Sequence, residues 1–179
     1  ESPAILVQTN PEDIALEQER SDQEAQREGI PAARYDAPYL ETLAVYRKMA
    51  RDMLMVQDTL LFHGSCLAVD DRAVLFTAVS GTGKSTHTRL WLDNISGAEL
   101  LNDDSPFVAC DDEGAKVYGS PWSGKTPCYR NECYPLRAMV RLSQAPHNAI
   151  NQLRGVRAIG ALLPSLPPAF VFDKALENA

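Results

Sequence analysis

The pattern of hydrophobic and polar residues changes near residue 58. Before that point, apolar side chains recur at helical spacing, weakly over residues 12–27 and clearly over residues 39–57. Gly29 lies between the two stretches and separates them, and Asp36 is a suitable N-cap for the second one. Residues 1–58 are therefore predicted to form a helical attachment that packs on the rest of the chain.

From residue 59 onward the apolar positions come in short runs that are typical of strands. The runs at 60–69 and 72–79, joined by Asp70 and Asp71, predict a β-hairpin. Further strand-like pieces follow at 99–101, 106–110, 115–118 and 136–142, with a helix expected from residue 156. Residues 59–179 are therefore predicted to form an α/β core on a mixed β-sheet. The chain ends as another helix begins, so we expect the core to continue beyond it.

A glycine-rich segment lies between one of these apolar runs and a helix-compatible stretch. Residues 78–86 read Ala-Val-Ser-Gly-Thr-Gly-Lys-Ser-Thr, and a strand, a glycine-rich turn and a helix form the context of a phosphate-binding loop. The first glycine of that motif is Ala78 here, and the alternative is a chance glycine–serine loop. Lys84 is placed to reach the β- and γ-phosphates, and the Ser85 hydroxyl to bind Mg²⁺. The expected nucleotide-binding residues are Ser80, Gly81, Thr82, Gly83, Lys84, Ser85 and Thr86.

Two adjacent carboxylates, Asp103 and Asp104, follow the apolar run at 99–101. Neighbouring side chains on an extended segment point to opposite faces, so the two are expected to do different work. One is a candidate to take a proton from an acceptor hydroxyl and the other to face a metal ion. The alternative is an ordinary turn with two solvated aspartates.

Two further residues are weaker candidates for the same site. His63 lies on the strand before the loop, and the predicted hairpin returns it near the phosphate loop as a metal or phosphate ligand; the alternative is a structural histidine. Lys125 ends a second loop, Gly-Ser-Pro-Trp-Ser-Gly-Lys, where it either faces a transferred phosphate or is an exposed lysine.

Composition and charge exclude several classes of protein. The net charge is −7, and residues 1–36 hold nine acidic and three basic residues, which argues against binding to nucleic acid. No apolar run approaches the ~20 residues that a membrane span needs, and no signal peptide is recognisable. The spacing of Cys128 and Cys133 matches no standard zinc or redox pair, so their role stays open. We expect a reduced, cytoplasmic protein with no membrane partner.

Taken together, these motifs resemble one superfamily. HGSCLAVDDRAVLFTAVSGTGKST, then LLNDD, then VYGSPWSGK is similar to the core shared by HPr kinase/phosphorylase and ATP-dependent phosphoenolpyruvate carboxykinase. As a whole, the chain most resembles bacterial HPr-kinase-like proteins that are described as carboxykinase-like. The resemblance covers about residues 59–125.

The resemblance implies a role for each candidate. Lys84 matches the phosphate-contacting lysine and Ser85 the Mg²⁺ ligand. Asp103 matches the aspartate that acts as base in the kinases, while Asp104 and His63 match metal ligands of the carboxykinases. Lys125 is a further match on the second loop. Ser105 stands where a carboxykinase has Glu, and the chain is too short for that enzyme.

These considerations predict an ATP- and Mg²⁺-dependent phosphotransferase, with Mn²⁺ as the alternative metal. It would transfer the γ-phosphoryl group to a hydroxyl of an unidentified protein or small molecule. Lys84, Asp103 and His63 are the expected catalytic residues, and Ser85, Asp104 and His63 the expected metal ligands. The alternatives are a nucleotide-binding regulatory protein without catalysis and a carboxykinase. The sequence specifies neither the base of the nucleotide nor the oligomeric state.

Overall fold

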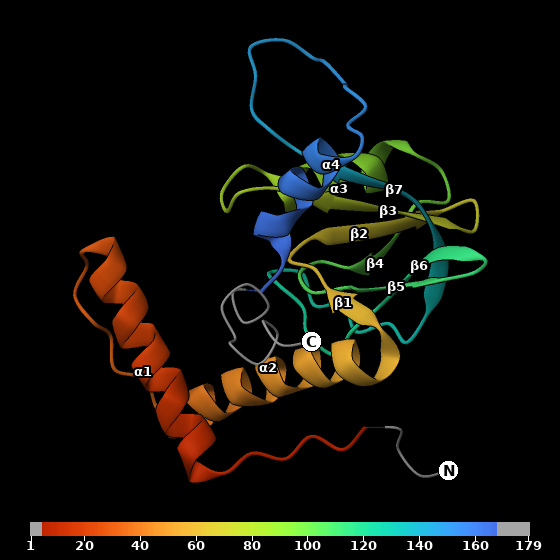
Figure 1. The fold of residues 1–179 in the computed structure, drawn as a ribbon. Helices are drawn as coiled ribbons and strands as arrows, with labels where there is room; N and C mark the ends of the chain where they lie inside the picture. Colours follow the sequence, from red (N-terminus) through yellow and green to blue (C-terminus); the bar gives the residue numbers. More distant parts are fainter. Residues whose placement is uncertain (1–4, 168–179) are drawn as a thin grey trace. The chain divides into compact units, whose positions relative to one another are not determined.

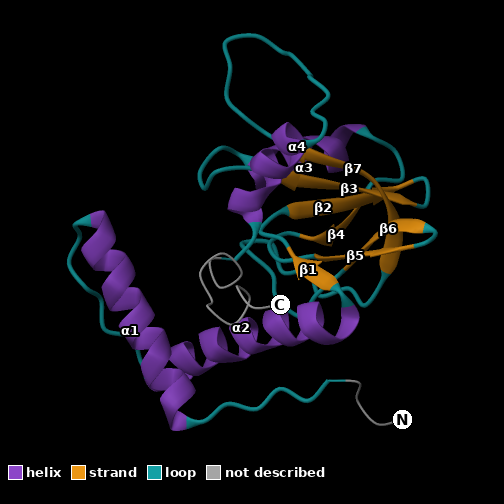
Figure 2. Ribbon diagram, in the orientation of Figure 1, coloured by secondary structure: helices purple, strands orange, loops and turns teal. Residues whose placement is uncertain are grey.

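The computed structural model describes residues 5–167, and the chain divides into two compact units, one up to Gln57 and one from Asp58 onward. The first unit is helical, and the second holds a mixed β-sheet with two further helices (Figures 1 and 2). The predicted α/β fold with a mixed sheet is therefore confirmed. None of the helices in the described part of the chain could cross a lipid bilayer.

The first unit consists of α1, Pro11–Glu28, and α2, Ala37–Gln57. Asn10 and Asp13 form a reciprocal capping box that satisfies free N–H groups at the start of α1. Ion pairs link the two helices: Arg47 to the buried Glu17 at 2.7 Å, and Lys48 to Asp13 at 2.5 Å. That this unit packs on the sheet stays a prediction.

The sheet of the second unit has seven strands in the order β1-β5-β6-β7-β3-β2-β4. Neighbouring strands are antiparallel except for β3 and β7, which run parallel. The strands are β1 Thr59–Leu61, β2 Ser65–Val69, β3 Arg72–Thr77, β4 Glu99–Asn102, β5 Phe107–Asp111, β6 Gly114–Tyr118 and β7 Cys133–Arg141. Because β3 and β7 are parallel, the segments that follow them leave the sheet at the same edge.

The predicted hairpin is formed by β2 and β3, which pair from Ser65↔Phe76 to Val69↔Arg72. The run expected as one strand at 60–69 is divided, because its first part belongs to β1, which pairs with β5 instead. Asp70 and Asp71 make the turn with φ angles of +48° and +57°. Two successive left-handed residues are the signature of a type I′ turn, whose twist suits the flanking strands. Aspartate tolerates this conformation better than most residues do.

The core of the second unit lies on the sheet and includes Phe62, Cys66, Leu75, Leu101 and Val117. Helix α3, Lys84–Asn94, packs on the sheet through aromatic contacts of Phe76 with His87 and Trp91, at ring-centroid distances of 4.8 and 5.5 Å. These contacts fix the start of α3 relative to the end of β3.

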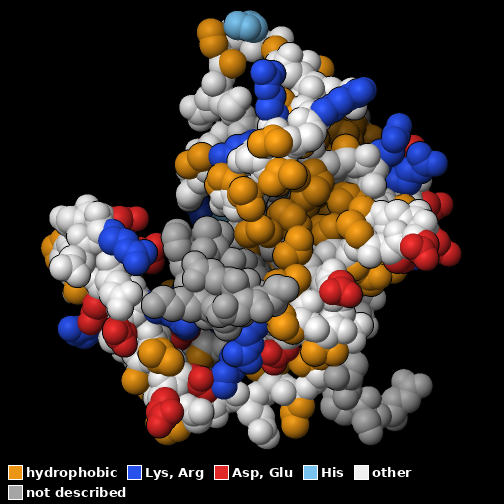
Figure 3. All heavy atoms as spheres, viewed as in Figure 1, with side chains coloured by type: hydrophobic (Ala, Val, Ile, Leu, Met, Phe, Trp, Pro, Cys, Tyr) orange, Lys and Arg blue, Asp and Glu red, His pale blue; other side chains and the backbone are white. Residues whose placement is uncertain are grey.

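Helix α4, Val156–Leu162, continues into a 3₁₀ turn, Leu163–Ser165. Leu162 packs against the core, whereas Val156 and Ile159 are exposed. In Figure 3, which has the viewpoint of Figure 1, hydrophobic side chains gather on the face of the molecule turned to the viewer.

Candidate functional site

The glycine loop, defined here as Val79–Gly83, connects β3 to α3. Gly81 and Gly83 have φ angles of +78° and +111°, which L side chains rarely adopt, so both positions require glycine. Ala78 is buried and keeps a negative φ, and for this reason alanine is accommodated where the motif has its first glycine.

The start of α3 carries no side-chain cap. Its N-cap is Gly83, which has no side chain to accept a hydrogen bond from the first turn, unlike the start of α1 with its capping box. The first N–H groups of a helix lack partners within the helix, and together with the helix dipole they form a favourable site for an anion. Ser80, Ser85 and Thr86 are exposed around this helix start, and Thr82 is half-buried.

Lys84 reaches back from the first turn of α3 to His63. The Nζ atom lies 3.1 Å from His63 Nε2 and 3.5 Å from the carbonyl oxygen of Ala78. An ammonium group can only donate, so Nε2 accepts and the imidazole is neutral in this arrangement. Burial and the positive charge of Lys84 lower the pKa of His63, which agrees with a neutral ring. Burial also lowers the pKa of Lys84, against the opposing effect of the two aspartates.

Asp103 is buried and held by a chain of hydroxyl groups. Ser65 Oγ donates to Asp103 Oδ1 at 2.8 Å, and Thr88 Oγ1 lies 2.8 Å from Ser65 Oγ. Thr88 belongs to α3 and is also 3.0 Å from the carbonyl oxygen of Lys84. The second oxygen, Asp103 Oδ2, is buried without a hydrogen-bond partner among the described residues. Such an unsatisfied buried carboxylate oxygen is rare in folded proteins and marks Asp103 as a candidate functional residue.

Asp104 has different surroundings. It is partly exposed, accepts from Ser105 Oγ at 2.7 Å, and its Oδ1 lies 3.5 Å from His63 Nδ1. Its carbonyl oxygen accepts from the N–H of Gly64 at 2.8 Å, which fastens the end of β4 to the segment between β1 and β2. His63 therefore lies between Lys84 and Asp104.

Asn102, the last residue of β4, organises the turn that carries both aspartates. Its Oδ1 accepts from the backbone N–H groups of Asp104 and Ser105 at 2.9 and 2.8 Å. Its Nδ2 donates to the carbonyl oxygen of Trp122 at 2.8 Å. This completely buried side chain thus ties the aspartates to the loop at residues 119–125.

That loop also touches Asp103 through its backbone. A Cβ atom on Gly124 would lie 2.7 Å from the carbonyl oxygen of Asp103, closer than real Cβ contacts come. Lys125 follows Gly124 and is exposed. The structure thus brings together His63, Lys84, Asp103 and Asp104, and it leaves Lys125 at the surface.

The donor set suits a metal ion that takes few protein ligands. Among residues 5–167 there is no group of three or more His, Cys, Asp and Glu side chains that could hold a metal. Asp104 and His63 offer one carboxylate and one imidazole, and Ser85 adds a hydroxyl at the start of α3. Mg²⁺ characteristically binds through one or two carboxylates, with waters and substrate phosphates as its other ligands.

The cysteines lie outside this chemistry. All four are free thiols, and burial raises the pKa of Cys66 to about 12. Cys128 lies within 3.4 Å of the carbonyl oxygens of Leu100 and Leu101, and burial raises its pKa as well. A protonated thiol is therefore favoured at both positions, and Cys133 is exposed on β7.

Sequence reasoning missed Ser65, Thr88 and Asn102. His63 was expected on a strand, but β1 ends at Leu61 and β2 begins at Ser65, so His63 lies in the bend between them. Strand alternation therefore gave no signal for Ser65, and none marked Thr88 or Asn102, since their roles depend on which segments meet in the folded chain.

Comparisons with known proteins add little. No family model matches this chain, and no curated protein sequence matches it. Among solved structures, the chain is similar to the Hpr(Ser) kinase/phosphatase from Coxiella burnetii, with 16% identity over 54% of this chain and 73% of that one, and a TM-score of 0.39. A likeness of this size carries no argument about function, so the geometry of the site has to carry it.

Proposed function

We propose that this protein is a nucleoside-triphosphate-dependent phosphotransferase. One observation carries the proposal: an uncapped helix start behind a glycine loop, a lysine, and two carboxylates in unlike surroundings meet at one end of the sheet. They come from α3, the β1–β2 segment and the end of β4. Phosphoryl transfer is catalysed mainly by positioning and by stabilisation of charge, and these groups suit both tasks.

The phosphates would lie against the glycine loop and the first turn of α3. The backbone N–H groups there have no side-chain cap, so they are available to anionic oxygens. Lys84 would turn from His63 to the β- and γ-phosphates, a short movement for a long and flexible side chain. That turn would free the Nε2 lone pair of His63.

Asp104, Ser85 and the freed His63 would hold Mg²⁺ or Mn²⁺. When bound, the ion would neutralise phosphate charge and orient the phosphate oxygens. Asp104 is partly exposed, and its Oδ1 lies 3.5 Å from His63 Nδ1, a contact that would orient the imidazole while the opposite nitrogen, Nε2, faces the ion. The hydrogen bond from Ser105 would keep the other carboxylate oxygen in place.

Asp103 would act as the base toward the acceptor hydroxyl. Ser65 fixes one carboxylate oxygen by a 2.8 Å hydrogen bond, and the buried second oxygen is free to accept a proton. General base catalysis contributes roughly 10²–10⁴-fold to a rate. The acceptor would be a hydroxyl of a protein or small molecule.

The first test is thermal unfolding with ATP, GTP, ADP and pyrophosphate, each with and without Mg²⁺ or Mn²⁺. A ligand at 100 times its Kd stabilises the folded state by about 2.7 kcal/mol, so we expect a metal-dependent rise in Tm. Lys84→Ala should abolish that rise, and Arg89→Ala, which removes an exposed cation further along α3, should keep it. A rise of equal size in Lys84→Ala would overturn the proposed site.

Transfer itself requires a second assay. Wild-type protein, nucleotide and metal would be screened against pooled acceptors, and labelled γ-phosphate on any acceptor would support an enzyme. Nucleotide binding without Asp103-dependent turnover would instead support a regulatory protein that only binds the nucleotide.

A further inference from the structure

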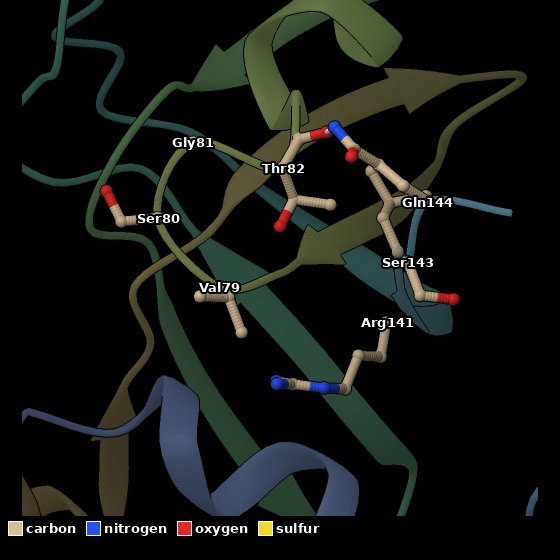
Figure 4. A pocket seen from close by; sticks show the side chains of 8 residues that line it. Val79, Ser80, Gly81, Thr82, Arg141, Ser143 and Gln144 are labelled. Atoms are coloured by element: carbon tan, nitrogen blue, oxygen red, sulfur yellow. Dashed lines mark hydrogen bonds between the residues drawn. The ribbon is translucent and has the colours of Figure 1, made fainter.

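A pocket of about 380 Å³ lies on the side of the glycine loop that faces the end of β7 (Figure 4). One wall is the loop itself, and the other is the segment that follows β7. The lining residues are Val79, Ser80, Gly81, Thr82, Arg141, Leu142, Ser143 and Gln144. The volume falls within the roughly 300–1,000 Å³ that is usual for small-molecule sites.

The parallel pairing of β3 and β7 creates this pocket. Thr77 pairs with Arg141 at the end of both strands, and the N–H of Leu142 donates to the carbonyl oxygen of Thr77 at 2.8 Å. The chain therefore leaves β7 beside the loop that leaves β3. Gln144 Nε2 lies 3.4 Å from the carbonyl oxygen of Thr82, which joins the two walls at one end.

The lining suits a polar organic ligand attached to an anion. Val79 and Leu142 offer apolar surface, whereas Ser143 and Gln144 offer groups that both donate and accept hydrogen bonds. Arg141 is the single charged residue of the lining, and its Nη1 donates to the carbonyl oxygen of Ala161 at 3.0 Å. This bond holds the guanidinium at the edge of the pocket, with further N–H donors left over.

We propose that this pocket binds the nucleoside part, base and ribose, of the nucleotide whose phosphates the glycine loop holds. The inference rests on the proposed function and adds the location of the base. None of Lys84, His63, Asp103 and Asp104 lines the pocket. A ligand in the pocket therefore lies away from Asp103, the proposed general base that must meet the acceptor hydroxyl. The nucleoside is the end of the nucleotide opposite the γ-phosphate, and it would be held next to the loop by its own phosphate chain.

The test compares the binding of Mg·ATP with that of Mg·tripolyphosphate, which carries the phosphates without the nucleoside, by isothermal titration calorimetry. Ser143→Phe would fill the pocket, Gln144→Ala would remove a polar contact without adding bulk, and Lys84→Ala would damage the phosphate site. Asn148→Phe is the matched control, because it adds the same ring at an exposed position of the same loop. The Tm of each unliganded variant reports on folding.

We expect Ser143→Phe to lower the affinity for Mg·ATP by about tenfold or more, equivalent to ~1.4 kcal/mol. Gln144→Ala should lower this affinity less. Both variants should bind tripolyphosphate as the wild type does, whereas Lys84→Ala should weaken both ligands. Two results would overturn the nucleoside pocket without contradicting the phosphate site. One is an equal loss of affinity for ATP and tripolyphosphate in the pocket variants, and the other is unchanged ATP binding in both of them. Unchanged nucleotide affinity with a loss of transfer would assign the pocket to the acceptor instead. If the wild type bound neither ligand, the proposed function would fall together with this inference.

Discussion

Ser65 Oγ donates a 2.8 Å hydrogen bond to Oδ1 of the buried Asp103, and this bond joins the start of β2 to the turn after β4. Thr88 supports it from α3. Thr88 is one turn beyond Lys84, so the helix that starts at the glycine loop also takes part in placing the proposed base. A change in the position of α3 should therefore alter the position of the Asp103 carboxylate through the hydroxyl groups of Thr88 and Ser65.

Replacing Ser65 by alanine should lower both stability and transfer. The buried carboxylate of Asp103 would lose the hydrogen bond from Ser65, a loss that costs about 1–3 kcal/mol in the free energy of unfolding. Urea unfolding would measure this cost, with Ser96→Ala at an exposed turn as the control. Ser65→Thr keeps a hydroxyl and should restore the transfer rate more than it restores stability. Equal unfolding free energies for Ser65→Ala and the wild type would contradict the role of this bond.

Asp103→Asn should separate binding from catalysis. The amide preserves the shape but is a poor base, so we expect nucleotide affinity within a few-fold of wild type and a transfer rate lower by roughly 10²–10⁴. Kinetics of transfer to an identified acceptor, beside calorimetry with Mg·ATP, would measure both. Asp112→Asn, in an exposed turn, is the control. Wild-type transfer by Asp103→Asn would remove Asp103 from the mechanism.

His63 should give the protein a pH dependence of definite sign. Its pKa is lowered from 6.5 in the folded state, so between these values the unfolded chain binds more protons than the folded one. The free energy of unfolding should therefore fall as the pH drops below about 6.5, and level off below the folded pKa. His63→Gln should remove this contribution. Urea unfolding of the wild type and of His63→Gln at a series of pH values would measure it, as the difference between their free energies of unfolding.

The same titration can be followed on the imidazole itself. The ring resonances of His63 should titrate with a midpoint below 6.5 in the wild type. In Lys84→Met the midpoint should rise, because one cause of the shift is gone, while burial keeps it from returning fully. A wild-type midpoint at or above 6.5 would contradict the contact between His63 and Lys84.

The turn between β2 and β3 offers a test of the fold alone. Asp71 has a φ of +57°, where a β-branched side chain is strained by about 1–2 kcal/mol. Asp71→Val should lower the free energy of unfolding by roughly that amount, and Asp71→Gly should leave it equal or slightly higher. Urea unfolding would measure the free energies of unfolding of the two variants. An equal loss of this free energy in both would show that the turn is not type I′.

Much of the fold followed from local pattern. The hairpin, the short strands and α3 are marked by apolar runs and turn residues, and the strands at 99–102, 107–111 and 114–118 lie within one residue of their predicted bounds. The predicted run at 60–69 is instead divided into β1 and β2, and β7 begins three residues earlier than expected. Asp70 and Asp71 make the expected turn, and both adopt the left-handed conformation. The order of the strands was not readable, because the pairing of β3 with β7 joins segments some sixty residues apart.

The candidate site divides in the same way. Lys84, Asp103 and His63 were recognisable because each belongs to a short motif. Asn102 and Arg141 were not, since Asn102 acts by bonding a loop twenty residues away and Arg141 by ending the strand parallel to β3. Such roles are set by tertiary contacts that a local pattern does not encode.

The uncapped start of α3 also affects the choice of buffer. Sulfate and inorganic phosphate would compete for the same N–H groups as a nucleotide, so a protein kept in either anion would already be partly stabilised. Its melting temperature would then rise less on addition of ATP than in a chloride buffer. The size of that difference would itself measure how strongly this helix end attracts a free anion.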